Sequence, residues 1–300
     1  MESIANKTIL VTGAGGRTGL VVVKKLLLQG ICNVRALIRS DQSKSKLINY
    51  LDEPGLANSA KLIVCFGDIT KKDQLVEPMA GVDALIICSS AAPKLDYWSM
   101  PMMMIRRYIF QDKTASPSFT YNDAIPEIVD WVGQKNQIDV AINSTTVKHV
   151  VVVGSMGGTM ENHFLNRMGN GNILLWKRKA ELYLMESGLT YTILHPGGLI
   201  SEDKVSKSGD REILIGIDDT LLQSENRSIP IVDVAEICVQ SLTTKKTFNR
   251  NFDLSSNATS KDHIFTTLDK LMDELGEGKN CDYSKPDLPQ SEALILLSKL

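Results

Sequence analysis

A glycine-rich turn near the start of the chain constrains the fold more than any other feature. A short apolar run leads directly into Gly13–Gly19 (GAGGRTG), and an amphipathic stretch follows. Strand, glycine turn and helix in this order are typical of the first unit of a Rossmann fold. Gly13 permits the tight turn, Gly16 lets the backbone approach a pyrophosphate, and Gly19 lets the helix pack close to the sheet. The turn therefore predicts a nicotinamide dinucleotide bound at the N-terminus of the helix.

The rest of the chain alternates between short apolar runs and longer amphipathic stretches. The apolar runs lack polar alternation, as strands buried on both faces of a parallel sheet do. The predicted strands are Lys7–Thr12, Val34–Arg39, Lys61–Phe66, Asp83–Cys88, His149–Val153 and Thr190–Leu194. The predicted helices are Thr18–Gln29, Lys72–Ala80, Ile125–Ser144, Asn172–Ser187 and Val232–Leu242. This order predicts an α/β class, a doubly wound parallel-sheet Rossmann fold that binds its ligand at the carboxyl ends of the strands.

We expect a single NAD(P)-binding domain over residues 1–275. An insertion over 93–126, rich in Met and aromatic residues, either covers the cleft or packs on the outside. Residues 201–230 contain a strand-like piece, Glu212–Ile217, and are expected to build a small C-terminal lobe on the substrate side. The tail, residues 276–300, is polar and then apolar, and either docks on the protein or meets a partner.

Composition argues against several classes of partner. The net charge of the 300 residues is −2, so nothing indicates nucleic acid or an anionic membrane as a partner. The apolar runs are too short to span a bilayer. Five scattered cysteines indicate a reducing compartment, and a strand that starts almost at once leaves little room for a leader, so we expect a cytoplasmic protein. No metal-ligand spacing occurs among the four His and five Cys, so no metal site is predicted.

The end of the second predicted strand indicates which dinucleotide binds. An acidic residue there suits the ribose hydroxyls of NAD, whereas a cation suits the 2′-phosphate of NADP. The strand ends at Arg39 and Ser40, and Arg17 lies in the glycine turn. Asp41 weakens the argument, and a solvated surface position is the alternative for each arginine. Two arginines without a carboxylate at the strand end favour NADP(H).

The next two strands end in residues that suit the rest of a dinucleotide. The third is followed by Asp68–Ile69, where the carboxylate can accept a hydrogen bond from the adenine amino group or cap the next helix. The fourth is followed by Ser89–Ala91, whose small side chains let the backbone approach a ribose. Both segments are predicted to line the cofactor cleft.

These residues together resemble the atypical short-chain dehydrogenase/reductases with an NmrA-like, NAD(P)-binding fold, and in particular a plant-type NADP-binding subgroup. The matching segments are Val11–Gly19, Phe66–Thr70, Ile128–Asp139, His149–Gly158, Gly169–Glu181, His195–Leu199 and Asp233–Leu242. The resemblance implies a six- or seven-stranded parallel sheet, NADP as ligand, and cofactor contacts from Lys179 and the Pro196–Gly198 turn. The resulting candidate cofactor-binding residues are Gly13, Gly15, Gly16, Arg17, Thr18, Gly19, Arg39, Ser40, Asp68, Ile69, Ser89, Ser90, Ala91, Lys179, His195, Pro196, Gly197 and Gly198.

The resemblance also implies a catalytic set of Ser, Tyr, Lys and Asn. In that set the Tyr exchanges the substrate proton, and the Lys holds the nicotinamide ribose and lowers the pKa of the Tyr. Ser155, Lys179 and Asp130 match the Ser, Lys and Asn positions, but the Tyr position holds Leu175. The usual proton donor is therefore absent from its motif. The candidate replacements near the presumed cleft are Tyr108, Tyr121 and His163, each of which also suits a packing or surface role.

The sequence therefore predicts an NADP(H)-dependent oxidoreductase that acts on a small apolar acceptor. A quinone, a flavin or a carbonyl compound fits, because hydride transfer needs only the cofactor and a placed acceptor. One alternative is a non-catalytic NADP(H)-binding redox sensor or regulatory module. A further alternative is an epimerase-like enzyme, which the missing Tyr disfavours. The sequence does not predict the oligomeric state.

Overall fold

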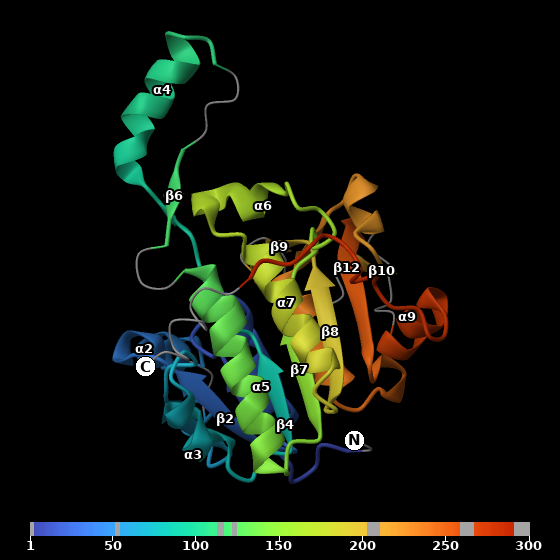
Figure 1. The fold of residues 1–300 in the computed structure, drawn as a ribbon. Coiled ribbons are helices and arrows are strands. Elements are labelled where there is room, and N and C mark those ends of the chain that lie inside the picture. The colour runs from blue at the N-terminus through green and yellow to red at the C-terminus, as the bar shows by residue number, and fades with distance from the viewer. Residues whose placement is uncertain are drawn as a thin grey trace.

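The protein folds around one central sheet of eight strands with helices on both faces (Figure 1), which confirms the predicted α/β class. The computed structural model describes residues 3–51, 55–112, 117–121, 125–202, 211–258 and 267–290. The strands of the sheet are β1 (Thr8–Thr12), β2 (Asn33–Ile38), β3 (Leu62–Phe66), β4 (Ala84–Ile87), β7 (His149–Val153), β8 (Thr190–Pro196), β10 (Arg211–Gly216) and β12 (Arg250–Ala258).

The strand order explains where a ligand can bind. The order is β10-β12-β8-β7-β4-β1-β2-β3, and every neighbouring pair is parallel except β10 with β12. The chain moves outward from β1 through β2 to β3 and then returns to place β4 on the other side of β1. In open parallel sheets such a reversal leaves a crevice at the carboxyl ends of the strands.

Two layers of helices bury the two faces of the sheet. The α1 and α8 helices pack together on one face of the sheet. The α3, α5 and α7 helices lie on the other face (Figure 1). The helices are α1 (Arg17–Gln29), α2 (Asp41–Tyr50), α3 (Val76–Met79), α4 (Met100–Tyr108), α5 (Gly133–Ser144), α6 (Phe164–Arg167), α7 (Ile173–Met185), α8 (Ile231–Ser241) and α9 (Leu268–Leu275). Short helical turns precede or follow some of them: η1 (Lys72–Leu75), η2 (Tyr97–Ser99), η3 (Glu127–Val132), η4 (Met168–Asn170), η6 (Thr220–Gln223) and η7 (Lys245–Thr247).

Burial on both faces accounts for the apolar strands. In β1, Ile9 and Val11 belong to the core cluster that includes residues of α1 and α8, whereas Leu10 belongs to the cluster that includes residues of α3 and α5. All three are fully buried. Since neither face of the strand meets water, its sequence has no polar alternation.

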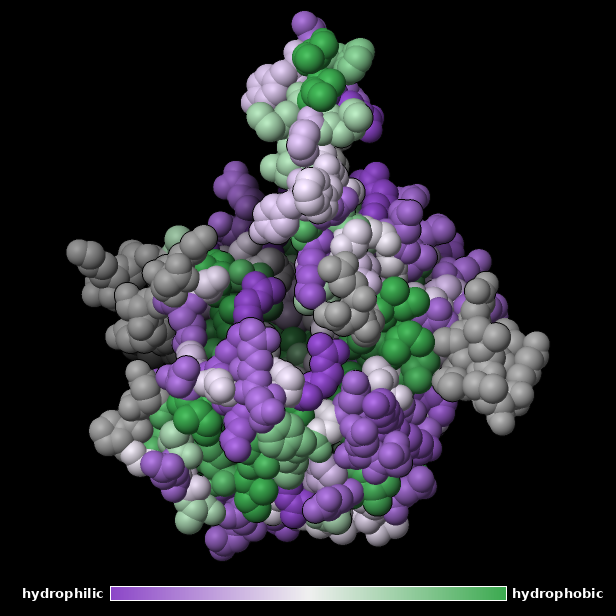
Figure 2. All heavy atoms as spheres, turned by 90° about the vertical axis from the view of Figure 1, so that its left-hand side faces the viewer, coloured by the Kyte–Doolittle hydropathy of each residue, from purple (hydrophilic) through white to green (hydrophobic). Residues whose placement is uncertain are grey.

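The insertion forms an arm that stands away from the body of the molecule. Its base is the antiparallel pair β5 (Lys94–Leu95) and β6 (Phe119–Thr120), and α4 forms its tip (Figure 1). Figure 2 shows hydrophobic residues exposed at this tip. Trp98 is 92% exposed and Phe110 is 72% exposed. The tip therefore neither covers the cleft nor packs on the outside, the two arrangements that the sequence suggested.

The predicted lobe over 201–230 is only partly a separate unit. Gly198–Ile200 (β9) and Ser228–Pro230 (β11) pair as a small sheet of their own. The predicted strand over 212–217, however, is β10 and extends the main sheet antiparallel to β12. It joins that sheet because β12 would otherwise offer an unpaired edge. Residues 203–210 lie outside the described part of the chain.

The tail docks on the protein as far as the structure describes it. Arg250 at the start of β12 donates hydrogen bonds to the carbonyls of Gly276 and Lys279, and Asn251 accepts one from Cys281 N at 2.6 Å. Residues 291–300, which hold most of the apolar end, lie outside the described residues. Among the described helices, none has the length and hydropathy needed to cross a bilayer.

Candidate cofactor and substrate site

A cavity of about 390 Å³ lies at the predicted position, where the ends of β1, β2, β3 and β4 meet. Its volume is in the range of small-molecule and cofactor sites. Half of the predicted cofactor-binding residues line it: Gly13, Gly15, Gly16, Arg39, Asp68, Ile69, Ser89, Ser90 and Ala91. These residues come from four separate strand ends, so the strand order brings them together.

The glycine turn leaves room that side chains would fill. A Cβ on Gly13 would lie 2.7 Å from Ser89 N, and a Cβ on Gly15 would lie 2.7 Å from the Cβ of Ser43. Gly13 also has a φ of +66°, which disfavours other residues. Gly16 is the N-cap of α1, and the first turn of that helix holds no acidic residue. The turn therefore fits a pyrophosphate held by backbone N–H groups and the helix dipole.

Two residues of the predicted turn have a packing role instead. Thr18 and Gly19 are buried and do not line the cavity. A Cβ on Gly19 would collide with the carbonyl oxygen of Gly13, so only glycine fits between helix and turn. This agrees with the predicted reason for Gly19, close packing of the helix.

The cationic end of the cavity differs from the prediction in one arginine. Arg39 lines the cavity, but Arg17 is exposed and does not. Lys46 of α2 lines it as a second cation, together with Ser43. Ser40 is the N-cap of α2 and accepts a hydrogen bond from Ser43 N at 3.3 Å, so its role is in folding. Ser43 and Lys46 were not among the predicted residues, although a helix start directly after the second strand was the signal that could have found them.

The residues after the third strand stabilise their own turn. Asp68 Oδ1 accepts hydrogen bonds from Thr70 N at 2.9 Å and Thr70 Oγ1 at 2.8 Å. Asp68 N in turn donates to Gln74 Oε1 at 2.9 Å. The carboxylate therefore stabilises this local turn and does not cap the next helix, whose N-cap is Lys71 without a side-chain hydrogen bond. Asp68 also lines the cavity.

A buried ion pair lies between the large cavity and a second, smaller one. Asp130, in η3, is fully buried, and its Oδ1 lies 2.9 Å from Lys177 Nζ. Its other oxygen accepts a hydrogen bond from Ala91 N at 3.0 Å, and Ala91 lines the large cavity. Lys177 and Ser155 line the smaller cavity of about 10 Å³. Asp130 therefore links the two cavities through one side chain.

The lysine that faces the interior is Lys177, not the predicted Lys179. Lys179 Nζ donates to the carbonyl of Pro289 at 2.5 Å and lies 5.1 Å from the ring centroid of Trp131. It lines neither cavity. Residues two apart on an α-helix point about 160° apart, so the two lysines of the Lys-Arg-Lys run lie on different sides of α7. The resemblance assigned the inner position to Lys179, whereas the structure has Lys177, two residues earlier, at the smaller cavity.

No tyrosine lies four residues before either lysine, but another tyrosine lies nearby. The residue four positions before Lys177 is Ile173, which is buried with Ala91 and Val129. Tyr121 packs against this cluster and lines the large cavity. Its buried hydroxyl has no hydrogen-bond partner among the described residues. Burial, with the negative charge of Asp130, raises the pKa of Tyr121.

The other two candidate donors have different surroundings. Tyr108 lies on the projecting α4 helix and is 74% exposed, so it is not near the cleft. His163 Nδ1 accepts a hydrogen bond from Leu165 N at 3.3 Å and so caps α6. Of the three candidates, only Tyr121 lines the large cavity.

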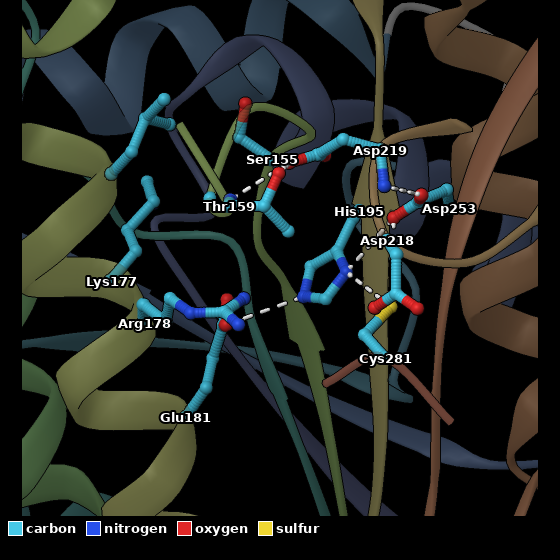
Figure 3. Close-up of a pocket in the computed structure, with 12 residues that line it drawn as sticks. Ser155, Thr159, Lys177, Arg178, Glu181, His195, Asp218, Asp219, Asp253 and Cys281 are labelled. Carbon is cyan, nitrogen blue, oxygen red and sulfur yellow. Dashed lines mark hydrogen bonds and ion pairs between the residues drawn. The ribbon is translucent and has the colours of Figure 1, made fainter. Parts of the chain in front are cut away.

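The residues predicted after the sixth strand lie away from the large cavity. His195 is buried beside the smaller one, where its ring nitrogens lie 3.3 Å from Glu181 and 3.2 Å from Asp253 (Figure 3). Burial alone would lower the pKa of His195, but Tyr283, Glu181 and Asp253 together raise it well above its usual value. His195 therefore belongs to a buried charge cluster at the smaller cavity, and it does not line the large cavity predicted to hold the cofactor.

The Pro-Gly-Gly turn after His195 is held by backbone contacts. Pro196 O accepts a hydrogen bond from Met156 N at 3.1 Å, and Gly197 N donates to Leu254 O at 2.9 Å. A Cβ on Gly197 would collide with the carbonyl oxygen of Arg227. Gly198 begins β9. The turn is thus required for close packing, and it does not line the large cavity.

Comparison with known proteins identifies the family. Residues 13–245 match the family described as NAD(P)H-binding. This chain belongs to that family. The match spans the glycine turn, the strand ends around the large cavity and all of α7. It confirms the resemblance to NAD(P)-binding short-chain reductases. It also confirms the predicted cofactor, a nicotinamide dinucleotide of the NADP(H) type.

Among three relatives of this chain, one is named as a reductase. Sanguinarine reductase of Eschscholzia californica is 44% identical over 264 residues, which cover 85% of this chain and 91% of that protein. An uncharacterized chloroplastic protein of Arabidopsis thaliana is 46% identical over 251 residues, 83% of this chain and 69% of that one. The chloroplastic protein TIC 62 of the same plant is 27% identical over 284 residues, 92% of this chain and 39% of that one. The prediction of an NADP(H)-binding oxidoreductase is confirmed, whereas its acceptor stays a prediction.

Solved structures share the fold. An oxidoreductase from Lactococcus lactis superposes with a TM-score of 0.58 at 17% identity, over 89% of this chain and 96% of that one. A short-chain dehydrogenase/reductase from Veillonella parvula in complex with NADP superposes with a TM-score of 0.55 at 15% identity, over 86% and 97%. Both confirm the Rossmann fold.

The expected cytoplasmic location was wrong. Two of the relatives above are described as chloroplastic, which points to a plastid. The expectation rested on scattered cysteines and an early first strand. A reducing environment is shared by more than one compartment, so cysteine usage does not separate them.

Proposed function

We propose that the protein reduces a small apolar acceptor with NADPH, and that Tyr121 donates the proton. A quinone, a flavin or a carbonyl compound is the class of acceptor. The observation that carries this proposal is the buried Tyr121 hydroxyl, which lacks a partner among the described residues and belongs to a side chain that lines the large cavity. Unpaired buried hydroxyls are uncommon in proteins, and a substrate oxygen would pair this one.

The wall around Tyr121 suits an apolar acceptor. Ala91, Val129 and Ile173 form the buried cluster against which its ring packs. Gly171 makes this packing possible, because a Cβ there would lie 2.5 Å from a ring carbon of Tyr121. Apolar walls exclude water from the acceptor and strengthen the hydrogen bond that the phenol donates to it.

The Asp130–Lys177 pair holds this wall in place. Asp130 accepts a hydrogen bond from Ala91 N, so the buried pair fixes the backbone after β4 against α7. Ser155 lines the smaller cavity together with Lys177. The resemblance assigns it the role of the serine that orients a substrate carbonyl. NADPH, when bound, supplies the hydride. Arg39 and Lys46 would hold the 2′-phosphate.

The proton is delivered by the chain rather than by the cofactor. Burial raises the pKa of Tyr121, so its phenol is protonated at neutral pH and is a weaker acid than a phenol whose pKa a lysine lowers. The phenol proton passes to the acceptor oxygen as the hydride arrives, and solvent reprotonates the phenolate. A carbonyl acceptor depends on this transfer. A quinone depends on it less, since its reduced oxygen can take a proton from water.

Replacement of Tyr121 tests the proposal. We expect Tyr121→Phe to lower kcat with aldehydes by about 100-fold or more and to change kcat with quinones less. The affinity for NADPH should not change. The measurement is NADPH oxidation over a panel of aldehydes, quinones and flavins, with Tyr108→Phe on the exposed arm as the matched control that keeps wild-type rates.

Two outcomes would contradict the proposal. Unchanged aldehyde reduction by Tyr121→Phe would show that another group donates the proton. Tight binding of NADPH without turnover on any acceptor would favour a redox sensor, the alternative that the missing Tyr-x-x-x-Lys motif keeps open.

A further inference from the structure

Three side chains of metal-ligating type meet beside the smaller cavity. His195 lies in β8, Asp253 in β12 and Cys281 in the docked tail (Figure 3). All three are buried. His195 and Asp253 are 58 residues apart in sequence, and Asp253 and Cys281 are 28 apart, so no short ligand motif indicates the site. We propose that these three residues bind one divalent metal ion of the zinc class.

The distances among the three donor atoms fit such an ion. His195 Nδ1 lies 3.2 Å from Asp253 Oδ1, and Cys281 Sγ lies 3.6 Å from that nitrogen and 3.8 Å from that oxygen. Tetrahedral zinc with ordinary bond lengths to N, O and S separates its ligand atoms by roughly 3.4 to 3.6 Å. The triangle of donors therefore has the size that one ion needs, without movement of the backbone.

The chemistry of the donor atoms limits which metal ions suit the site. Imidazole nitrogen with a thiolate suits zinc or cobalt, whereas calcium and magnesium prefer oxygen alone. Such an ion binds the neutral imidazole and the thiolate, so its uptake releases protons and strengthens as the pH rises.

The surroundings of the donors orient them as supporting groups do in metal sites. His195 Nε2 lies 3.3 Å from Glu181 Oε2 and 3.1 Å from the Tyr283 hydroxyl. A carboxylate on the far nitrogen fixes the tautomer that presents the other nitrogen to a metal. The second oxygen of Asp253 accepts a hydrogen bond from Asp219 N at 2.7 Å, which leaves Oδ1 for the ion.

The smaller cavity has room for a water molecule as the fourth ligand. Its volume of about 10 Å³ is roughly that of one water, and it is lined by His195, Asp253 and Cys281 together with Ser155 and Lys177. Three protein ligands and one water match the coordination of zinc sites that keep an open position. Such an ion would also fasten the tail to the sheet, because one ligand comes from the tail and two from strands.

Cobalt titration of the metal-stripped, untagged full chain tests the site. We expect the wild type to take up one Co²⁺ per chain and to show a near-ultraviolet thiolate-to-cobalt charge-transfer band that excess Zn²⁺ removes. Cys281→Ser should abolish the band and weaken binding at least tenfold. Cys65→Ser, a half-buried cysteine in β3 and far from the cluster in the strand order, is the matched control and should keep both.

A second variant keeps the test valid if Cys281→Ser does not fold. Asp253→Asn preserves the shape of the side chain and should keep the thiolate band while it weakens Co²⁺ binding about tenfold or more. No stoichiometric uptake by the wild type, or a band that survives Cys281→Ser, would overturn the proposal. NADPH binding, measured in parallel, reports on the other cavity and separates this result from the proposed reductase activity.

Discussion

Lys177 and Lys179 show how two identical side chains in one helix acquire different environments. Lys177 is ion-paired with the fully buried Asp130, whereas Lys179 contacts a tail carbonyl and two tryptophan rings. A buried charge left without its partner costs several kcal/mol. Loss of the Lys177 side chain should therefore both destabilise the fold and disturb the cavity wall that Asp130 supports.

We predict that Lys177→Met lowers the free energy of unfolding by about 3–5 kcal/mol. Lys179→Met, its matched control, should lower it by no more than about 1 kcal/mol, the scale of a partly exposed cation–π contact. Urea unfolding followed by circular dichroism measures both. The double variant Lys177→Met/Asp130→Leu should recover much of the loss, since an apolar pair can replace a buried ion pair. Equal losses in the two single variants would contradict the assignment of Lys177 as the inner lysine.

His149 makes stability depend on pH. It is buried at the start of β7, with Nε2 2.9 Å from Thr192 Oγ1 and its ring centroid 4.6 Å from that of Phe248. Burial lowers the pKa of His149 to about 3. In the unfolded chain the pKa returns to about 6.5. The unfolded state thus binds the extra proton first as the pH falls.

We therefore predict that protonation of His149 in the unfolded chain lowers the free energy of unfolding as the pH falls from about 6.5 to about 3. Above this window the titration of His149 should have no effect on stability. The free energy of unfolding should fall by up to about 1.4 kcal/mol per pH unit from this group. His149→Leu removes the titration, so the difference in unfolding free energy between wild type and variant should change with pH only inside the window. A difference that stays constant from neutral pH down into the window would contradict the prediction.

At the scale of elements, apolar strands were predictable and polar ones were not. The strands β1, β2, β4, β7 and β8 have apolar sequences because both faces are covered. The edge strand β3 is also apolar, although Ile63 and Phe66 are about half exposed. The buried β12 strand was missed because it carries polar residues that find partners inside the fold. Asn251 Oδ1 accepts from Cys281 N, and Ser256 Oγ donates to Ser228 O. No local pattern announces such partners, since they come from distant segments.

The junction of β2 and α2 carries a prediction about the cofactor. Arg39 follows the strand and Lys46 faces the same cavity from the helix. We predict that the wild type binds NADPH more tightly than NADH and that Arg39→Ala reduces the preference at least tenfold. Arg17→Ala, a variant of the exposed arginine outside the cavity, should leave it nearly unchanged. Fluorescence titration with both cofactors measures the ratio, and equal wild-type affinities would contradict the prediction.

At the scale of the whole molecule, the cofactor cleft was more predictable from the sequence than the rest of the site. The cleft follows from strand ends whose order the Rossmann pattern dictates, so the sequence predicted that Gly13, Arg39 and Ala91, which line the cavity, would lie together. The charge cluster was not, because it joins β8, α7 and a tail without periodicity. His195 was predicted as a cofactor contact and lies instead in this cluster, and Tyr283 was not predicted at all.

Docking of the tail should contribute measurably to stability. The Tyr283 hydroxyl donates to Glu181 Oε2 at 2.8 Å in the buried cluster, and Arg178 lies 4.0 Å from its ring centroid. We predict that Tyr283→Phe lowers the free energy of unfolding by about 1–3 kcal/mol, because a buried carboxylate loses a hydrogen bond. Tyr97→Phe on the exposed arm, the control in the same urea experiment, should change it by less than about 0.5 kcal/mol. No difference between the two variants would show that the tail contributes nothing through this residue.

Hydride transfer from a bound nicotinamide to an acceptor in the large cavity is the central claim about this molecule. Transfer of deuterium tests it directly, with NADPH labelled in turn at each of the two hydrogens on C4 of the nicotinamide. For an aldehyde acceptor that the protein reduces, mass spectrometry of the alcohol should find deuterium from one label and not from the other. An alcohol free of deuterium from both labels, or NADPH that binds without forming any reduced product, would contradict it.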